Sequence, residues 1–230
     1  MNSIEAITFD LDNTLWETDV SILGAERVMH DHLLEVAPAA MMADFSLEAF
    51  RATRATVVAE QPDIAHQLTV VRRETLIRWF IERGASRAEA EGLAGEGFRV
   101  FYHARQQVEP YPGTEDAIAK LASRFPLAAI TNGNADLMAM PLGRHFKFSL
   151  QAEHFPAAKP DPAMFESALD RLGVPPHACL HVGDDLAHDV QGAQAVGMKA
   201  AWVNTRGREI DTGFEPDLII RQVADLLDHL

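Results

Sequence analysis

The stretch that most constrains this chain lies at its beginning, in residues 4–15, which read IEAITFDLDNTL. Apolar and β-branched residues run up to Phe9, and two aspartates, Asp10 and Asp12, follow one residue apart before Thr14. This pattern predicts a strand that ends in an acidic loop. Ligands bind at the carboxyl ends of strands in open α/β sheets, where two carboxylates can serve as nucleophile and proton carrier. By itself, the pair is equally typical of a strand end with two solvated acids.

Composition narrows the classes of protein that this chain can belong to. The 230 residues carry a formal net charge of −14, which argues against binding to nucleic acid, whose phosphates require a basic surface. The single cysteine, Cys179, excludes a disulfide framework and indicates a reducing compartment. No apolar run approaches the ~20 residues of a membrane-spanning helix, and the first predicted strand leaves no room for a signal peptide. We therefore expect a cytoplasmic protein without a membrane partner.

The spacing of apolar residues changes from strand-like to helical after Leu15. Four helical segments follow without an intervening strand, beginning near residues 19, 46, 65 and 86. Such a run indicates a self-contained helical bundle. The sequence therefore predicts a four-helix domain over residues 17–108, inserted into a catalytic core made of residues 1–16 and 109–230.

The remaining sequence alternates between strand and helix patterns. Strands are predicted at residues 126–131, 146–150, 178–182, 199–203 and 217–220. Helices are predicted at residues 114–124, 161–173, 186–196 and 221–229. Alternation of this kind predicts an α/β fold, a Rossmann-like doubly wound parallel sheet. The strand over residues 4–10 should lie at its centre, because its neighbours in the sequence belong to the helical insertion.

Polar residues recur at the predicted strand ends and beside them. They are Asp10 and Asp12, then Thr131, Asn132 and Gly133, then Lys159 before a helix, and finally Asp184, Asp185 and Asp189. In a parallel sheet these strand ends share one edge, so we expect the groups to converge. Crowded carboxylates repel one another unless one is protonated or a cation binds, and hard oxygen ligands select Mg²⁺.

The same residues suit an incoming phosphate ester. The Thr131 hydroxyl and the amides of Asn132 and Gly133 can hold phosphate oxygens, and Lys159 adds positive charge. A carboxylate can attack phosphorus to give an aspartyl-phosphate. Asp12 can protonate the leaving oxygen and later deprotonate the attacking water.

Four motifs carry a resemblance to a known family: FDLDNTLW (9–16), ITNGN (130–134), KPDP (159–162) and HVGDDLAHD (181–189). The chain resembles the haloacid dehalogenase superfamily, in the form with a helical cap inserted after the first strand. The resemblance implies Asp10 as nucleophile, Asp12 as general acid and base, and contacts from Thr131 and Lys159 to the phosphoryl group.

The resemblance also implies a metal site. Mg²⁺ would be held by Asp10, by the main-chain carbonyl of Asp12 and by Asp184. Asp189 would then support the ligands or contact the metal through water, and Asp185 would either bind the metal directly or support its ligands.

Several functions within and outside this superfamily share the motifs. Dehalogenases lack an acid at the position of Asp12, because a halide leaves without a proton, so Asp12 favours phosphoryl transfer to water. A phosphomutase or phosphotransferase would share the motifs, and a silent binding protein would be expected to lack Asp10 or Asp184. Three stretches are similar to sequences of bacterial phosphatases that act on FMN and on 5-amino-6-(5-phospho-D-ribitylamino)uracil: FDLDNTLW, PLAAITNGNADL and LHVGDDLAHDVQGAQAVGM. This similarity implies a small phosphomonoester as substrate.

The insertion should contact the part of the substrate beyond the phosphate. Trp16 either stacks on a flat ring of the substrate or, the favoured interpretation, serves as a hinge or core aromatic. Arg72 and Arg73 are adjacent on a predicted helix, so they point in different directions. Either one of them reaches an anionic substrate or, the favoured interpretation, they form a solvated helical face. The sequence leaves open whether the protein is a monomer or a homodimer.

Overall fold

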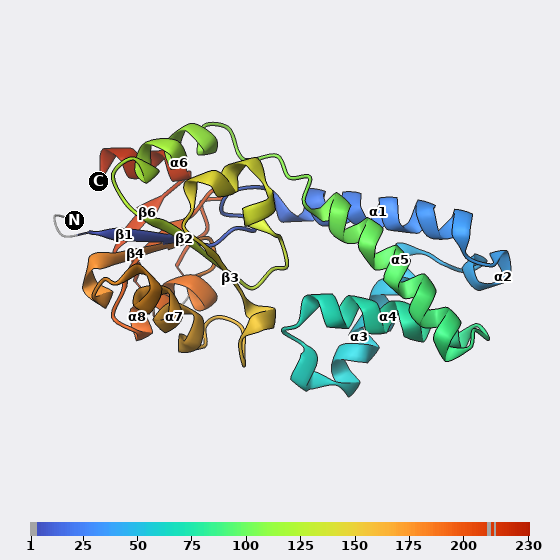
Figure 1. Ribbon diagram of the computed structural model, residues 1–230. Helices are drawn as coiled ribbons and strands as arrows, with labels where there is room; N and C mark the ends of the chain where they lie inside the picture. Colours follow the sequence, from blue (N-terminus) through green and yellow to red (C-terminus); the bar gives the residue numbers. More distant parts are fainter. Residues whose placement is uncertain (1–3, 211–212, 214) are drawn as a thin grey trace. The chain divides into compact units, whose positions relative to one another are not determined.

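The structure is a computed structural model, and it describes residues 4–210, 213 and 215–230. The described part of the chain divides into two compact units (Figure 1). A core unit comprises Met1–Glu17 and Glu109–Leu230, and a helical unit comprises Thr18–Val108. The core unit thus includes Glu17, which the sequence assigned to the insertion.

The core unit is built around a parallel sheet. In the described residues its strands are β1 (Ala6–Phe9), β2 (Leu127–Thr131), β3 (Ser149–Gln151), β4 (Cys179–Gly183), β5 (Lys199–Val203) and β6 (Leu218–Ile220), in the order β3-β2-β1-β4-β5-β6. The predicted parallel sheet with the first strand inside it is therefore confirmed. Every residue of β1, β2 and β4 is buried, as expected for parallel strands covered on both faces.

Helices cover both faces of this sheet. Helix α6 (Thr114–Ala122) lies on one face, and α7 (Pro162–Leu172) and α8 (Gly192–Ala195) lie on the other (Figure 1). Helix α7 begins where the sequence predicts, because an Asp161 side-chain oxygen accepts a hydrogen bond from the Ala163 amide at 3.0 Å. It ends at Gly173, whose φ of 70° is the left-handed conformation that glycine favours.

Two predicted α-helices of the core unit take other forms. Residues 186–196 form a π-helical turn, Leu186–Gln191, and then α8. The Asp185 carbonyl accepts hydrogen bonds from the amides of both Asp189 and Val190, which widens the first turn. Residues 221–229 form a 3₁₀ helix, Val223–Asp228, whose first turn is closed by Asp225 N–H bonding the Gln222 carbonyl.

The helical unit contains α1 (Thr18–Val36), α2 (Ala39–Met42), α3 (Leu47–Glu60), α4 (Leu68–Glu82) and α5 (Arg87–Arg105). Helices α1 and α4 both pack against α5. The single-turn helix α2 was not predicted, because four residues are too few for a periodic pattern. Ser46 and Ser86 cap α3 and α5 by accepting hydrogen bonds from the amides of Ala49 and Glu89.

A buried aromatic and aliphatic cluster holds the helical unit together. It includes Leu33, Phe50, Leu76, Trp79, Phe80 and Phe101. This unit therefore has a core of its own, separate from the cluster that packs around the sheet. None of the helices in the described residues is both long and apolar enough to cross a bilayer.

Candidate active site

Three strands bring their polar ends to one edge of the sheet. In the sheet register, Phe9 pairs with Ala129 on one side and with Val182 on the other. The residues that follow, including Asp10, Thr131 and Asp184, therefore lie at the same edge. This convergence is what the alternating sequence pattern predicts for a parallel sheet.

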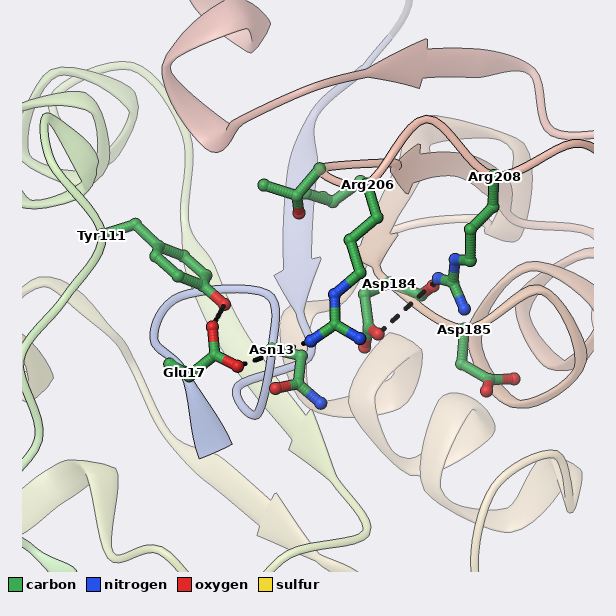
Figure 2. Close-up of a pocket in the computed structure, with 9 residues that line it drawn as sticks. Asn13, Glu17, Tyr111, Asp184, Asp185, Arg206 and Arg208 are labelled. Carbon is green, nitrogen blue, oxygen red and sulfur yellow. Dashed lines mark hydrogen bonds and ion pairs between the residues drawn. The ribbon is translucent and has the colours of Figure 1, made fainter. Parts of the chain in front are cut away.

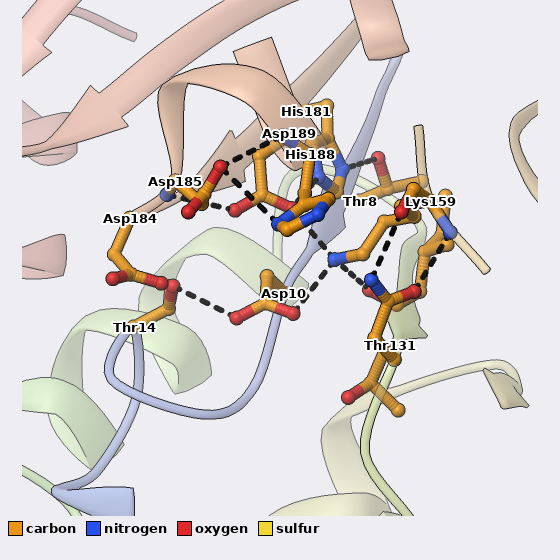
Figure 3. Close-up of polar contacts among 12 residues, drawn as sticks. Thr8, Asp10, Thr14, Thr131, Lys159, His181, Asp184, Asp185, His188 and Asp189 are labelled. Atoms are coloured by element: carbon orange, nitrogen blue, oxygen red, sulfur yellow. Dashed lines mark hydrogen bonds and ion pairs between the residues drawn. The ribbon is translucent and has the colours of Figure 1, made fainter. Parts of the chain in front are cut away.

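Lys159 lies at the centre of the buried part of this edge (Figure 3). Its ammonium donates hydrogen bonds to Asp10 Oδ1 at 2.7 Å, to Asp189 Oδ1 at 2.6 Å and to the Ile130 carbonyl at 2.8 Å. Only 3% of the residue is exposed. All three ammonium hydrogens thus have partners, as a buried charge requires.

Burial and the charges of neighbouring groups act in opposite directions on the pKa values of this cluster. Burial alone would lower the pKa of Lys159, but the carboxylates of Asp10 and Asp189 outweigh burial and raise it above its ordinary value. Burial raises the pKa of Asp10 to about 8, against the opposing effect of Lys159. Burial also acts to raise the pKa of Asp189, but Lys159 and His181 hold it well below its usual range. Asp189 is therefore the permanent partner of Lys159.

Asp10, Asp184 and Asp189 could hold a metal ion, because one carboxylate oxygen from each lies within 4.8 Å of the others. Burial, followed by repulsion from Asp189 and Asp185, raises the pKa of Asp184 to about 6. Burial is the main cause of the raised pKa values of Asp10 and Asp184, and the neighbouring carboxylates add to it. These groups therefore fit a cation with hard oxygen ligands.

Asp185 and Asp189 have different local roles. Asp185 Oδ1 accepts hydrogen bonds from the amides of Ala187 and His188 at the start of the π-helical turn. Asp189 Oδ2 accepts a hydrogen bond from the Asp185 amide at 3.0 Å, and so holds the loop that carries Asp184. A Cβ at Gly183 would lie 2.2 Å from Asp189 Cγ, so only glycine permits this packing.

A buried histidine lies behind Asp189. His181 Nδ1 is 2.8 Å from the Thr8 hydroxyl oxygen, and its Nε2 is 3.2 Å from Asp189 Oδ1. Burial lowers the pKa of His181, so the ring is neutral at pH 7. His181 is thus a packed strand residue that supports Asp189.

The turn after β2 carries Thr131, Asn132 and Gly133. The Asn132 side chain joins this turn to Lys159: Oδ1 accepts from the Lys159 amide at 2.8 Å, and Nδ2 donates to the Lys159 carbonyl at 3.1 Å. Thr131 Oγ1 accepts from the Gly133 amide at 2.9 Å. Thr131 and Gly133 therefore lie at the sheet edge, while the Asn132 side chain fixes the main chain of Lys159.

The second aspartate of the first motif faces this turn. A Cβ at Gly133 would lie 2.3 Å from Asp12 Oδ2, so glycine leaves the space that the carboxylate occupies. The other oxygen, Oδ1, accepts a hydrogen bond from the Trp16 indole at 2.9 Å. In the same loop, Thr14 Oγ1 donates to Asp10 Oδ2 at 3.2 Å. Two residues of the first motif, Trp16 and Thr14, thus donate hydrogen bonds to its two aspartates, Asp12 and Asp10.

A pocket of about 420 Å³ opens within the core unit beside Asp184 (Figure 2). Its lining includes Asn13, Glu17, Tyr111, Asp184, Asp185, Arg206 and Arg208. Arg206 Nη2 lies 3.4 Å from Glu17 Oε1, and Arg208 Nη2 lies 3.9 Å from Asp184 Oδ2. Its volume falls within the range of small-molecule sites. Sequence reasoning missed Tyr111, Arg206 and Arg208, because they lie in irregular segments outside the four motifs.

The three residues proposed for substrate selection have different surroundings. Trp16 is 1% exposed, which agrees with the favoured interpretation as a core aromatic. Arg72 is buried, and it donates to Glu26 Oε1 at 3.1 Å, so the expectation of a solvated face was wrong for this residue. Its guanidinium also lies 3.7 Å from the centre of the Phe101 ring. Arg73 is exposed.

Comparison with known proteins shows to which proteins this chain is related. A family model described as haloacid dehalogenase-like hydrolase matches residues 4–197. The chain is 34% identical to 5-amino-6-(5-phospho-D-ribitylamino)uracil phosphatase YigB of Escherichia coli (strain K12), over 98% of this chain and 96% of that protein. It is 27% identical to phosphoglycolate phosphatase of Chromobacterium violaceum, over 99% and 97% of the two chains. These named relatives are consistent with a phosphoric monoester hydrolase.

A solved structure agrees over nearly the whole chain. The structure of 2-haloacid dehalogenase from Pseudomonas syringae pv. Tomato DC3000 matches with a TM-score of 0.91 and 39% identity, over 98% of this chain and 97% of that one. The predicted resemblance to haloacid dehalogenase enzymes, and to ribitylaminouracil phosphatases among them, is confirmed. The chain therefore belongs to the haloacid dehalogenase-like hydrolase family.

Proposed function

We propose that this protein is a Mg²⁺-dependent phosphatase that hydrolyses small phosphomonoesters through an aspartyl-phosphate on Asp10. The observation that carries the proposal is that the Asp12 carboxylate lies against Gly133, in the turn that carries Thr131. The alkoxide that leaves a phosphate ester needs a proton, whereas a halide does not. An acid at this place therefore favours phosphate esters as substrates.

The carboxylates of Asp10 and Asp184 are the proposed metal ligands, with the main-chain carbonyl of Asp12 as a third. Burial, helped by neighbouring carboxylates, raises the pKa values of both groups, and one oxygen of each lies within 4.8 Å of the other, which supports a cation between them. Bound Mg²⁺ would neutralise these ligands and an incoming phosphate dianion. Asp189 would position the site, because Lys159, His181 and the Asp185 amide already engage its oxygens.

The proposed reaction has two steps. First, an Asp10 carboxylate oxygen attacks phosphorus, the bond between phosphorus and the ester oxygen breaks, and Asp12 gives its proton to that oxygen. Next, Asp12 takes a proton from water while the water oxygen attacks phosphorus, which releases inorganic phosphate and restores the Asp10 carboxylate. Lys159 and the Thr131 hydroxyl would hold the phosphoryl oxygens in both steps.

The substrate is proposed from the Escherichia coli relative and from the pocket. That relative is named for 5-amino-6-(5-phospho-D-ribitylamino)uracil, so we propose this ester and FMN as the first candidates. The pocket beside Asp184 offers Tyr111, Arg206 and Arg208 to the part of the substrate beyond the phosphate. In a chain with a net charge of −14, these two exposed arginines are local sites for an anionic group.

We propose that the helical unit, Thr18–Val108, acts as a cap that excludes water during the reaction. Arg73, which is exposed, is the remaining candidate on α4 for contact with a substrate. We further propose that the enzyme works in the cytoplasm.

A second candidate function is carbon–halogen hydrolysis. The 39% identity and TM-score of 0.91 to a structure named 2-haloacid dehalogenase favour it. A phosphatase activity should require Mg²⁺, whereas dehalogenation should proceed without a metal. Release of phosphate from p-nitrophenyl phosphate and of chloride from 2-chloropropionate, each with Mg²⁺ and with EDTA, separates the two activities. Chloride release in EDTA without phosphate release in Mg²⁺ would overturn the proposal.

A panel of phosphomonoesters then identifies the substrate. It would contain FMN, the ribitylaminouracil phosphate, phosphoglycolate, sugar phosphates and nucleotides, each compared by kcat/KM. A preference of ~100-fold for the flavin-related esters corresponds to ~2.7 kcal/mol of differential transition-state binding and would support the substrate assignment. An equal kcat/KM for all esters would contradict the substrate assignment but would still agree with the proposed phosphatase reaction.

Replacement of the nucleophile tests the mechanism. Asp10→Asn should lower kcat by ~10³-fold or more, because an amide cannot form the phosphorylated intermediate. The variant should unfold at the same temperature as the wild type or higher, since it removes a buried carboxyl group whose pKa is raised to about 8. Mass spectrometry would exclude deamidation back to aspartate. Residual activity close to that of the wild type would contradict a covalent intermediate on Asp10.

A further inference from the structure

The two oxygens of the Asp12 carboxylate have different surroundings. Oδ1 accepts a hydrogen bond from the Trp16 indole N–H at 2.9 Å. Oδ2 lies where a side chain at position 133 would stand, 2.3 Å from an ideal Cβ at Gly133. The carboxylate is therefore directed toward the turn that carries the Thr131 hydroxyl, and only glycine at 133 permits this.

Trp16 is held firmly enough to position another group. It is 1% exposed, and its main-chain carbonyl accepts a hydrogen bond from the Asn13 amide at 2.8 Å. Its backbone also forms isolated β-bridges to Asp12 and to Pro110. Pro110 lies where the chain returns from the helical unit. The indole donor is thus fixed by its own main chain as well as by packing.

The chemistry of indole makes this contact more than a structural one. An indole N–H is a donor only and neither accepts a hydrogen bond nor takes up a proton. It can bond Asp12 Oδ1 whether the carboxyl group is protonated or ionised, but it cannot share a proton carried on Oδ1. A proton on Asp12 is consequently directed to Oδ2, the oxygen beside Gly133.

We propose that Trp16 is a positioning residue that keeps Asp12 Oδ2 as the oxygen through which protons pass to and from the reacting group. The inference deepens the proposed function and rests on Asp12 as its general acid and base. The sequence alone favoured a hinge or core aromatic at this position over stacking on the substrate. The hydrogen bond between the indole and the carboxylate adds a role in proton transfer.

Trp16→Phe removes the N–H and keeps a buried ring, so it tests the positioning role. Loss of a well-placed acid slows departure of an alkoxide, but p-nitrophenolate leaves without protonation. We expect kcat/KM for the alkyl phosphate that the wild type hydrolyses fastest to fall ~10- to 100-fold, part of the whole effect of general acid catalysis. For p-nitrophenyl phosphate we expect a change of less than about 3-fold.

Three further variants make the outcome interpretable. Asp12→Asn should show the same selectivity for leaving groups, with a larger loss for the alkyl ester. Trp79→Phe is the matched control, because Trp79 is also 1% exposed and donates its indole N–H, at 3.0 Å, to the main-chain carbonyl of Met41. It should leave the ratio of the two esters unchanged. If Trp16→Phe does not fold, β-(3-benzothienyl)alanine at position 16 keeps the indole shape without its N–H.

The possible failures are distinct from one another. Equal losses for both esters in folded Trp16 variants, or no loss for either, would overturn the positioning role. A wild type that hydrolyses neither ester, or an Asp12→Asn variant that retains full activity on the alkyl ester, would instead overturn the proposed function.

Discussion

At the scale of single residues, the site depends on one buried cation. Lys159 contacts two carboxylates, Asp10 and Asp189, at 2.7 and 2.6 Å in an environment with almost no solvent. Those carboxylates differ: the pKa of Asp10 is raised by burial, whereas that of Asp189 is held low by its partners despite burial. Lys159 therefore stabilises the folded state as well as orienting the site.

Lys159→Met should destabilise the protein by ~3–5 kcal/mol, because it leaves buried carboxylates without their cation. Urea unfolding at pH 7.5, followed by circular dichroism, measures this loss. Lys199→Met is a suitable control, since Lys199 pairs with Asp217 at the surface, where such a pair contributes less than about 1 kcal/mol. Equal destabilisation of the two variants would contradict the central role of Lys159.

Sequence reasoning at this scale identified types of residue better than their contacts. The motifs indicated Asp10, Asp12, Lys159 and Asp184, and all four lie at the carboxyl edge of the sheet. The same motifs assigned the Asn132 amide to phosphate, which stays a prediction, and the structure gives the Asn132 side chain a separate contact with the main chain of Lys159. A partner 27 residues away depends on how two loops meet, which no local pattern records.

At the scale of elements, the helical unit contains a buried ion pair of its own. Glu26 on α1 is 1% exposed and accepts hydrogen bonds from Arg72 on α4 at 3.1 Å and from Arg51 on α3 at 2.6 Å. Burial lowers the pKa of Arg72 to about 10, against the opposing effect of Glu26. The carboxylate thus joins three helices at one point.

Glu26→Gln should lower the stability of the helical unit by ~2–4 kcal/mol, because the buried Arg72 loses its counter-charge. Thermal unfolding observed by circular dichroism at 222 nm would report the loss. Glu60→Gln, which breaks an exposed pair with Arg78, should leave the melting temperature nearly unchanged. The importance of the buried pair would be refuted if Glu26→Gln melted at the wild-type temperature.

Helix and strand types were predictable because their signals are local. Asp161 and Gly173 mark the two ends of α7 in the sequence, and the structure uses both as caps. The segment after β4 was predicted as an ordinary helix and forms a π-helical turn instead. There the widened turn follows from two hydrogen bonds to one carbonyl, that of Asp185.

At the scale of the whole molecule, negative charge dominates, with a net charge of −14 and several acids at one sheet edge. In the metal-free protein the pKa values of Asp184 and Asp10 are raised to about 6 and about 8 by burial. As the pH rises, the unfolded chain loses these protons near the ordinary pKa of 3.8, whereas the folded protein loses them only near pH 6 and pH 8. The contribution of both groups to stability is therefore present below about pH 4 and is lost as the pH rises toward 8.

Mg²⁺ should reverse this loss, because it binds the ionised carboxylates. At 100 times its dissociation constant a ligand adds ~2.7 kcal/mol, or about 5–10 °C in melting temperature for a domain of this size. We expect a shift of that size at pH 8 and a much smaller one at pH 5, as measured by thermal unfolding with Mg²⁺ and with NaCl of equal ionic strength. Asp184→Asn should reduce the shift at pH 8. A shift that is larger at pH 5 would rule out binding through these groups.

The sequence by itself determined the parallel sheet, the inserted helical segments and the residue types at the sheet edge. It could do so because burial imposes a period on each strand and helix, and chain order places strand ends at one edge. Only the tertiary structure decided that Arg72 is buried against Glu26, that Asn132 holds Lys159, and that the Trp16 indole reaches Asp12. Hydrogen bonds made by side chains act over about 3 Å, so they depend on packing that periodicity along the chain does not specify.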